Sequence, residues 1–318
     1  MTSTELEAQP AARTWFGMDR QERQRIAKQL PNYLFILPFL VAFLLFTVYP
    51  VLFGAWMSLH DWDIISKAPP MIGLANYEEL LHDDLWWLTL RQTLQYALQT
   101  VLSVVAVSLK KELITFQDFR GRGWFRVIYY FPVTMSVAVV ALAWQWLLNT
   151  DYGLVNYALS LFGIGKVRWL QAPALMLPSL SIASLWGSFG FPMLIFLAGL
   201  SDIPPHLYDA AQVDGANGWQ RFWKITLPLL RPTLLFVLVT QFIGRLQEFG
   251  IPYTMVGITT QYTGASGFHH WTVIVYLFQT AWHWYRMGYG SALAFALAVV
   301  IVVITMIQFR LLGRRLQY

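Results

Sequence analysis

The sequence predicts an all-α membrane protein with six transmembrane helices. Hydrophobic residues make up 57% of the 318-residue chain and charged residues only 12%, whereas soluble domains are typically about one quarter charged. Six segments are apolar over the roughly 20 residues that a helix needs to cross a bilayer. Lys and Arg gather on alternate connections between these segments, as expected for cytoplasmic loops. Lipid is therefore the expected solvent for most of the chain.

The predicted spans are separated by short polar connections. They are Leu34–Ser58, Leu88–Leu109, Arg126–Leu148, Ala174–Leu200, Pro232–Phe249 and Met287–Phe309. Residues 1–32 are polar and lack the apolar stretch of a cleavable signal, so we expect them to form a tail. Residues 33–318 are expected to form one transmembrane domain.

The basic residues define the predicted orientation. Sixteen Lys and Arg residues lie in the two tails and in the Lys110–Arg126 and Ser201–Arg231 connections, against five on the opposite side. Both termini and the Ser201–Arg231 segment are therefore predicted to be cytoplasmic. The net charge of +5 follows this asymmetry, which argues against a nucleic-acid partner, and the absence of cysteine excludes disulfides and thiolate chemistry.

One further apolar stretch, Trp271–Tyr285, competes with this arrangement. As a seventh span it would place Arg314 and Arg315 outside the cell. Trp and Tyr are favoured at membrane interfaces. We therefore interpret the stretch as an interfacial or re-entrant helix that leads into the last span.

The Ser201–Arg231 connection has an unusual composition for a loop between spans. Pro204 and Pro205 suit the first turn of a helix, where the missing N–H costs nothing. Ser201 or Asp202 is expected to cap that helix. The small side chains of Ala210 and Ala211, which follow in the same helix, allow another backbone to approach closely.

A break and a second helix are predicted in the same connection. Gly215, after Asp214, is expected to end the first helix because glycine adopts the left-handed conformation at little cost. The second helix is expected to stop at Pro228, and its apolar face to consist of Trp219, Phe222, Trp223 and Ile225. Such an element is either a passive interfacial connector or a rigid handle for a second protein.

The stretch "LYDAAQVDGANGWQRFWKITLPLLRP" (Leu207–Pro232) closely resembles the EAA loop of ATP-binding-cassette importer permeases. That pattern is Glu-Ala-Ala, three residues, Gly, and then Ile, two residues and Pro. The matching residues are Ala210, Ala211, Gly215, Ile225 and Pro228, while Asp209 stands where the family has Glu. The pattern "DGA…F…ITLP…P" within this stretch is also similar to that of the carbohydrate-uptake branch of the family.

Four other motifs agree with this resemblance, which extends over about Tyr33–Arg315. They are "GLANYEELL" (Gly73–Leu81), "RGRGWFRVIYYFP" (Arg120–Pro132), "DYGLVN" (Asp151–Asn156) and "MGYGSALA" (Met287–Ala294). The resemblance implies a permease subunit of a type I, binding-protein-dependent carbohydrate importer in the cell membrane. The substrate would be a di- or oligosaccharide, a related polyol or glycerol phosphate.

The resemblance also implies partners and a coupling mechanism. The partners would be a second homologous permease subunit, two ATPase subunits and an extracytoplasmic solute-binding protein. The cytoplasmic helix–turn–helix, about residues 201–231, would be the coupling loop that docks on the ATPase. Its expected contact residues are Asp209, Ala210, Ala211, Asp214, Gly215, Ala216, Phe222, Ile225 and Pro228. This chain would bind no cofactor, because ATP and Mg would be used by the ATPase.

Ionisable residues inside a span are candidates for function. Arg245 and Glu248 lie three positions apart in the fifth predicted span and are expected to share a helix face. They form either a structural ion pair that joins two spans or part of a polar wall of the substrate path. Related sugar permeases use matching positions for the substrate, which favours the second interpretation.

The fourth predicted span offers hydroxyl groups and an aromatic ring at helical spacing. Ser184, Ser188 and Phe191 would suit a sugar, which needs hydrogen bonds and a stacking surface, but small and hydroxyl residues also serve ordinary helix packing in membranes. Trp144, Trp146 and Trp186 either stack on a sugar ring or fill space.

Other function classes have little support. "GIGKV" (Gly163–Val167) lacks the Ser or Thr and the strand of a phosphate loop, and no catalytic constellation suggests an enzyme. His269, His270 and His283 fit no metal motif. The alternative is a secondary carrier driven by an ion gradient, which predicts internal repeats with matched broken helices; the sequence shows no convincing repeat.

Overall fold

The computed structural model of the chain describes residues 34–65, 68–116, 120–257 and 271–313. Within these ranges the protein is helical, and the only extended pairing is an isolated bridge between His60 and Met71. The predicted N-terminal tail lies outside the described residues. The helical structure of the described ranges confirms the predicted all-α class.

The chain divides into two units, Met1–Trp56 and Met57–Tyr318. In the first unit a helix begins at Leu34 and continues, through a π-helical turn η1 (Leu44–Val48), into α2 (Tyr49–Met57). Its side chains are apolar and exposed, with Phe35 and Phe46 more than 80% accessible. This surface needs lipid or another subunit to cover it, because contiguous apolar area is unfavourable in water.

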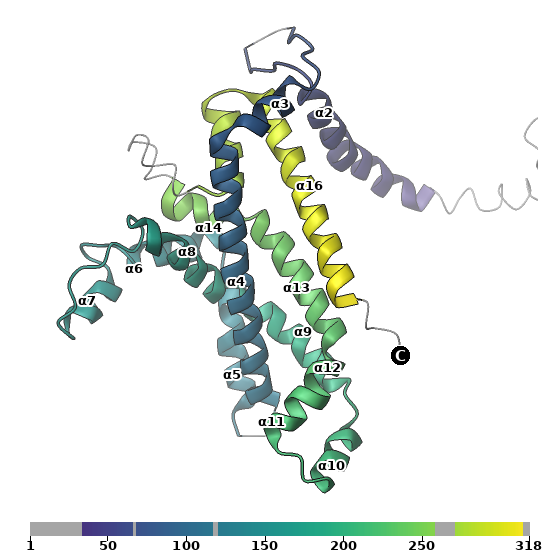
Figure 1. Cartoon of the computed structure of the whole chain (residues 1–318), viewed down its shortest axis with the longest axis vertical. Coiled ribbons are helices and arrows are strands. Elements are labelled where there is room, and N and C mark those ends of the chain that lie inside the picture. The colour runs from purple at the N-terminus through teal and green to yellow at the C-terminus, as the bar shows by residue number, and fades with distance from the viewer. Residues whose placement is uncertain (1–33, 66–67, 117–119, 258–270, 314–318) are drawn as a thin grey trace, which may run out of the picture. The chain divides into compact units, whose positions relative to one another are not determined.

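The second unit is built around one long helix (Figure 1). After α3 (Ala75–His82), α4 runs from Asp84 to Phe116 and includes the whole predicted second span. It packs on α8, α9 and α13. Thr93, Tyr96 and Thr100 on α4 are fully buried, so protein rather than lipid surrounds much of this helix.

The third predicted span is broken. It consists of α5 (Arg122–Tyr130), a 3-10 turn η2 (Phe131–Thr134) and α6 (Val137–Leu147), and the segments meet at 97°. Met135 and Ser136 are extended. The prediction of one continuous helix over Arg126–Leu148 was therefore wrong.

The fourth predicted span is also bent. Helices α8 (Pro173–Ser188) and α9 (Gly190–Ser201) meet at 54° around Phe189. Pro192 explains the break, because proline cannot donate to the carbonyl four residues earlier, that of Ser188, and its ring crowds it. The expectation of a straight span over Ala174–Leu200 missed this proline effect.

Side chains from α4 and α5 surround the bend. Ser108 Oγ donates a 2.8 Å hydrogen bond to the carbonyl of Phe189. Lys111 Nζ lies 3.8 Å from the ring centre of Tyr129 and 4.0 Å from that of Phe189. A cation between two aromatic faces is attracted to both, so the bend is held by specific contacts.

Beyond α9, the chain forms α10 (Pro205–Val213), α11 (Gly218–Arg221), a π-helical turn η3 (Phe222–Thr226) and α12 (Leu227–Leu229). Helix α13 then covers Arg231–Leu246, and α14 (Gly250–Pro252) and η4 (Tyr253–Gly257) follow it. The predicted fifth span ends later than α13, since Gln247 leaves the helix.

The chain ends in α15 (Val273–Phe278), a π-helical turn η7 (Gln279–His283) and α16 (Met287–Leu312). The first two are six and five residues long, too short to span, as expected for Trp271–Tyr285. Of its Trp and Tyr side chains, however, Trp271 and Tyr276 are buried in the protein, and Trp282, Trp284 and Tyr285 are exposed. The aromatic belt is therefore only part of this stretch.

Within the described part of the chain, three helices are long and apolar enough to cross a membrane, Leu34–Met57, Arg231–Val256 and Met287–Leu312. The number rises to five if each bent pair is one span. Helix α4, which carries buried polar residues such as Thr93 and Thr100, is not among them. Six spans remain a prediction.

Candidate functional site

The Ser201–Arg231 connection folds into two short helical segments, α10 and α11–α12, which we call the coupling element. It lies at the end of the second unit that is away from α3 (Figure 1). Pro204 is the N-cap of α10 and Pro205 its first residue. The predicted caps were wrong: Ser201 Oγ donates instead to Leu197 O within α9, and Asp202 makes no cap hydrogen bond.

A tight turn joins the two segments. Gly215 adopts φ +77°, a conformation that other residues reach only at a cost. The Ala216 amide donates to Ala211 O at 2.8 Å, which completes the helix end. Asn217 and Gln220 form a reciprocal capping box at the start of α11, a signal that the sequence carried and our prediction missed.

The second segment does not stop at Pro228. It passes through η3 into α12 and turns only at Leu230, before α13 begins at Arg231. Pro228 follows the π-helical turn η3 with no break in the helical segment, so the proline lies within the segment and does not end it. The coupling element is therefore joined to α13 by a single turn residue.

The base of the element is fixed by packing. Leu200, Ile203 and Leu230 form a buried cluster, against which Leu109 and Leu113 of α4 pack. The hydroxyls of Tyr208 and Thr226 are 3.0 Å apart and join the two segments. Each such hydrogen bond contributes about 1 kcal/mol, so the segments are held as one body.

The tip of the element is exposed. Asp209, Ala210, Asp214 and Gly215 are accessible, whereas Ala211, Ala216, Phe222, Ile225 and Pro228 are half-buried. Val213 at the tip is 89% exposed. The hollow of the turn encloses about 400 Å³ between Ala211, Gly215 and Ile225. All nine predicted coupling residues thus lie on one small element, with the exposed ones around its turn.

A second group of predicted residues meets inside the second unit. Arg245 near the end of α13 forms an ion pair with Glu248, and both side chains are largely buried, 13% and 11% exposed. Glu248 lies beyond the end of α13, so the two residues do not share a helix face as we expected. The pair forms because Glu248 follows Arg245 by only three residues, just beyond the end of α13 at Gln247.

Tyr96 of α4 connects this pair to the fourth predicted span. Its hydroxyl donates to Glu248 Oε2 at 2.9 Å and also bonds to the hydroxyl of Ser184. Tyr96 and Ser184 are fully buried. We call Tyr96, Ser184, Arg245 and Glu248 the polar cluster. Sequence reasoning missed Tyr96, although a tyrosine among the glutamines of a span was a signal.

The other predicted path residues lie outside the polar cluster. Ser188 donates to Ser184 O at 2.5 Å, while Phe191 lies beyond the bend and is 51% exposed. The bend therefore separates side chains that helical spacing had placed on one face. Trp144 and Trp186 do meet edge to face, but Trp146 is exposed and packs on Tyr152.

Two buried polar atoms on α13 remain unsatisfied. Among the described residues, Arg245 Nε and Gln241 Oε1 have no hydrogen-bond partner. An unpaired buried donor or acceptor costs about 1–3 kcal/mol. Both atoms therefore retain hydrogen-bonding capacity.

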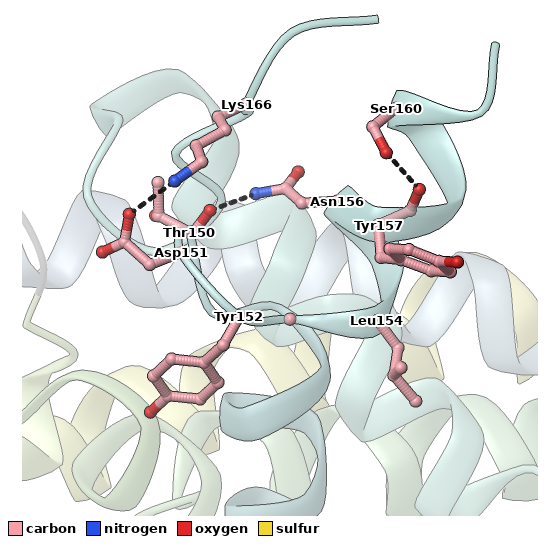
Figure 2. A pocket seen from close by; sticks show the side chains of 9 residues that line it. Thr150, Asp151, Tyr152, Leu154, Asn156, Tyr157, Ser160 and Lys166 are labelled. Carbon is pink, nitrogen blue, oxygen red and sulfur yellow. Dashed lines mark hydrogen bonds and ion pairs between the residues drawn. The ribbon is translucent and has the colours of Figure 1, made fainter.

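The connection between α6 and α8 forms a separate polar site around a cavity of about 400 Å³. Figure 2 shows Thr150, Tyr152, Leu154 and Lys166 around this cavity, with α7 (Leu154–Ser160) on one side. Asp151 and Lys166 form an exposed ion pair of 2.9 Å.

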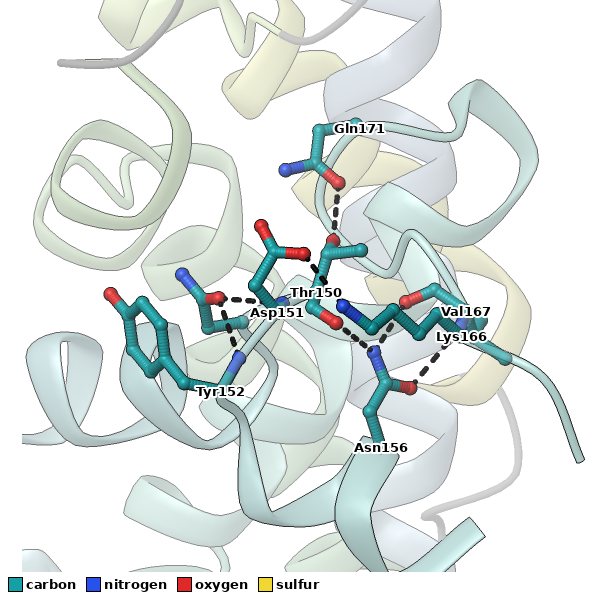
Figure 3. Close-up of polar contacts among 8 residues, drawn as sticks. Thr150, Asp151, Tyr152, Asn156, Lys166, Val167 and Gln171 are labelled. Carbon is teal, nitrogen blue, oxygen red and sulfur yellow. Dashed lines mark hydrogen bonds and ion pairs between the residues drawn. The ribbon is translucent and has the colours of Figure 1, made fainter. Parts of the chain in front are cut away.

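Asn156 is the centre of that connection (Figure 3). Its Nδ2 donates to Thr150 O and Val167 O, at 3.0 and 2.9 Å. Its Oδ1 accepts from Val167 N and Trp169 Nε1. The asparagine of "DYGLVN" therefore holds the two ends of the connection together, a structural role for a motif that only the resemblance had selected.

Two more motifs meet at the far end of the second unit. Asn76 of "GLANYEELL" donates to Ser58 O and His60 O, and Gly288 of "MGYGSALA" lies against the same backbone, where a Cβ would overlap His60 O. The Tyr276 and Tyr289 hydroxyls both donate 2.6 Å hydrogen bonds to Asp83. Burial, and then the bond to Asp83, raises the pKa of Tyr276 above its usual value.

The described residues contain no group of three His, Cys, Asp or Glu side chains arranged to hold a metal ion. His283 lies in η7, and His269 and His270 lie outside the described residues.

Residues 104–318 match the family described as binding-protein-dependent transport system inner membrane component. The chain belongs to this family. It is therefore an inner-membrane permease component of a transport system rather than its catalytic part, as predicted from the Leu207–Pro232 motif.

The permease is similar to characterised and probable transporter subunits. It is 36% identical to the probable ABC transporter permease protein YesP of Bacillus subtilis (strain 168), over 92% of this chain and 94% of that protein. It is also 36% identical to the trehalose/maltose transport system permease protein MalF of Thermococcus litoralis, over 71% and 77% of the two chains. Both similarities confirm the predicted class, an ATP-binding-cassette transporter permease.

A solved structure supports the same fold. The permease matches a chain of a bacterial ABC transporter involved in the import of the acidic polysaccharide alginate with a TM-score of 0.76 and 25% identity. The match covers 94% of this chain and all of that chain.

Proposed function

We propose that the permease forms one half of the path for a carbohydrate in an ATP-driven importer. A second homologous permease subunit supplies the other half, two ATPase subunits use ATP and Mg, and an extracytoplasmic solute-binding protein delivers the substrate. The chain crosses the membrane six times, with both termini in the cytoplasm. Relatives named for trehalose, maltose and alginate transport support a carbohydrate substrate.

The coupling element is the observation that carries this proposal. Its tip is exposed, its base is packed on α4, and one turn residue joins it to α13. A displacement applied at the tip is therefore transmitted to α13, because little flexible backbone lies between them to absorb the movement. ATP-dependent closure of the ATPase subunits biases a two-state permease through this element. The nine coupling residues predicted from the sequence form the contact.

The polar cluster forms part of the substrate path. A carbohydrate presents many hydroxyl groups, and Ser184, Arg245 and Glu248 supply donors and acceptors within one group of residues. The unsatisfied atoms Arg245 Nε and Gln241 Oε1 support a polar ligand at this side of α13. Ser188 contributes through its contact with Ser184, and Phe191 offers an accessible ring for stacking.

Replacement of Gly215 tests the proposal. Gly215→Val introduces a β-branched residue at φ +77° without meeting a neighbouring atom within 4 Å, so it strains the turn but preserves every charge. Gly218→Val, three residues away, also meets no atom within 4 Å and has no positive φ, which makes it the matched control.

The complex with its partner subunits is reconstituted, and ATPase co-purification and carbohydrate uptake are measured. We expect Gly215→Val to lose both and Gly218→Val to retain them. Normal co-purification and uptake in Gly215→Val would reject the coupling role. Uptake that follows an ion gradient without any ATPase subunit would instead identify a secondary carrier.

A further inference from the structure

A wide groove separates the last turns of α4 from the start of the second coupling segment. It has a volume of about 910 Å³. Leu109 and Leu113 of α4, Leu200 of α9 and Phe222 of η3 contribute apolar surface to it. A groove of this size and composition accepts hydrocarbon chains.

Two cations stand beside this apolar surface. Lys110 of α4 and Arg221 of α11 both line the groove, and the described residues that line it include no carboxylate. Neither cation forms an ion pair with another described residue. Among the described residues, the groove therefore combines an apolar floor with two cations that no lining carboxylate neutralises.

Lys110 directly follows the predicted second span, Leu88–Leu109. No charged residue lies between Arg91 and Lys110 in the sequence. A Lys at the end of an apolar stretch favours a position with its ammonium among lipid headgroups. Trp219, which also lines the groove and is 69% exposed, has the side chain that is enriched at this level.

We propose that this groove binds an anionic glycerophospholipid. The phosphate lies between Lys110 and Arg221, and an acyl chain lies along Leu109, Leu113 and the exposed Ile114 of α4. The lipid would thus fill the space between α4 and the coupling element, so that the position of the element depends on membrane composition.

The charge pattern favours a lipid over other occupants. A peptide of neutral or basic composition would leave the two cations without compensation, and free phosphate would leave the apolar floor exposed to water. An anionic lipid satisfies both parts, because juxtamembrane Lys and Arg each attract anionic headgroups by about 1 kcal/mol, or about fivefold in affinity.

The test uses the full-length chain in nanodiscs that contain equal amounts of phosphatidylglycerol and phosphatidylcholine. Lipids that remain bound after extraction into mild detergent are counted by native mass spectrometry. We expect the unmodified chain to retain phosphatidylglycerol preferentially. The Lys110→Gln/Arg221→Gln double variant should reduce this preference about thirtyfold, and each single variant about fivefold.

Lys224→Gln is the matched control. Lys224 is an exposed cation on the same segment, but it lines the hollow of the coupling turn instead of the groove. It should retain phosphatidylglycerol, and Lys110→Arg, which preserves the charge, should do so too. If the double variant does not fold, the single variants and Lys110→Arg decide the outcome.

Three results would overturn the proposal. They are equal retention of the two lipids by the unmodified chain, an equal loss in Lys224→Gln, and displacement of the lipid by millimolar inorganic phosphate. The last result would identify a simple anion site without a role for the acyl chains.

Discussion

The hydroxyl of Tyr96 and the carboxylate of Glu248 are joined by a hydrogen bond of 2.9 Å, although the residues are 152 positions apart in the sequence. Tyr96 belongs to α4 and Glu248 follows α13. The same hydroxyl bonds to Ser184 of α8. The Tyr96 hydroxyl therefore connects three segments of the unit, and a displacement of any one of them alters its hydrogen bonds with the others.

Tyr96→Phe removes the hydroxyl and preserves the ring. We expect the free energy of unfolding in detergent to fall by about 1–3 kcal/mol, because the buried Ser184 and Glu248 each lose a partner. Tyr157→Phe, at an exposed tyrosine of α7, should leave it unchanged within about 0.5 kcal/mol. Thermal unfolding of both variants measures the difference, and equal stabilities would show that the Tyr96 hydroxyl contributes nothing.

The Arg245–Glu248 pair should show strong coupling. Removing one partner leaves a buried charge and typically costs about 3–5 kcal/mol, so Arg245→Met and Glu248→Gln alone should each be strongly destabilising. The double variant should be less destabilised than the sum of the two. A double-mutant cycle of unfolding free energies checks this, and additive effects would mean that the two side chains do not interact.

Asn156→Asp tests the centre of the α6–α8 connection. The carboxylate keeps the acceptor but faces two carbonyl oxygens that the amide had donated to, so the connection should loosen and become sensitive to proteolysis. Asp151→Asn removes only an exposed ion pair, which contributes at most about 1 kcal/mol. Comparable cleavage rates in the two variants would contradict the central role of Asn156.

Gly153→Ala should destabilise the same connection for a steric reason. A Cβ at this position would lie 2.5 Å from Leu147 O and 2.7 Å from Asn149 N, so the backbone must move, at about 1–3 kcal/mol. Gly165→Ala is the control, because its Cβ would meet no atom within 4 Å. Thermal unfolding distinguishes the two, and an unchanged Gly153→Ala variant would show that the backbone adapts freely.

Local sequence signals predicted the helical class and the coupling element well. Pro205 has a φ fixed near the helical value and Gly215 adopts a positive φ at little cost, so the start of α10 and the turn follow directly from them. The breaks in the third and fourth predicted spans were harder to predict. Hydropathy indicates how long an apolar segment is, but not whether the helix bends within it. Pro192 was visible in the sequence, but the size of its bend depends on how α8 and α9 pack on α4.

The polar cluster could be predicted only in part. Arg245 and Glu248 were prominent because charges are rare in spans. Tyr96 was not, since its role depends on α8 and α13 lying on either side of α4, and no local pattern contains that information. Phe191 was placed with Ser184 by helical spacing, which the bend at Phe189 invalidates.

The contacts around Phe189 have a mechanical consequence. Lys111 lies between the rings of Tyr129 and Phe189, and Ser108 holds the Phe189 carbonyl. If α8 and α9 aligned into a straight rod, the ammonium would lose a ring and the serine its acceptor at the same moment. The angle between α8 and α9 is thus stabilised by α4 and α5. A transport cycle that straightens these helices must also move α5 and the end of α4.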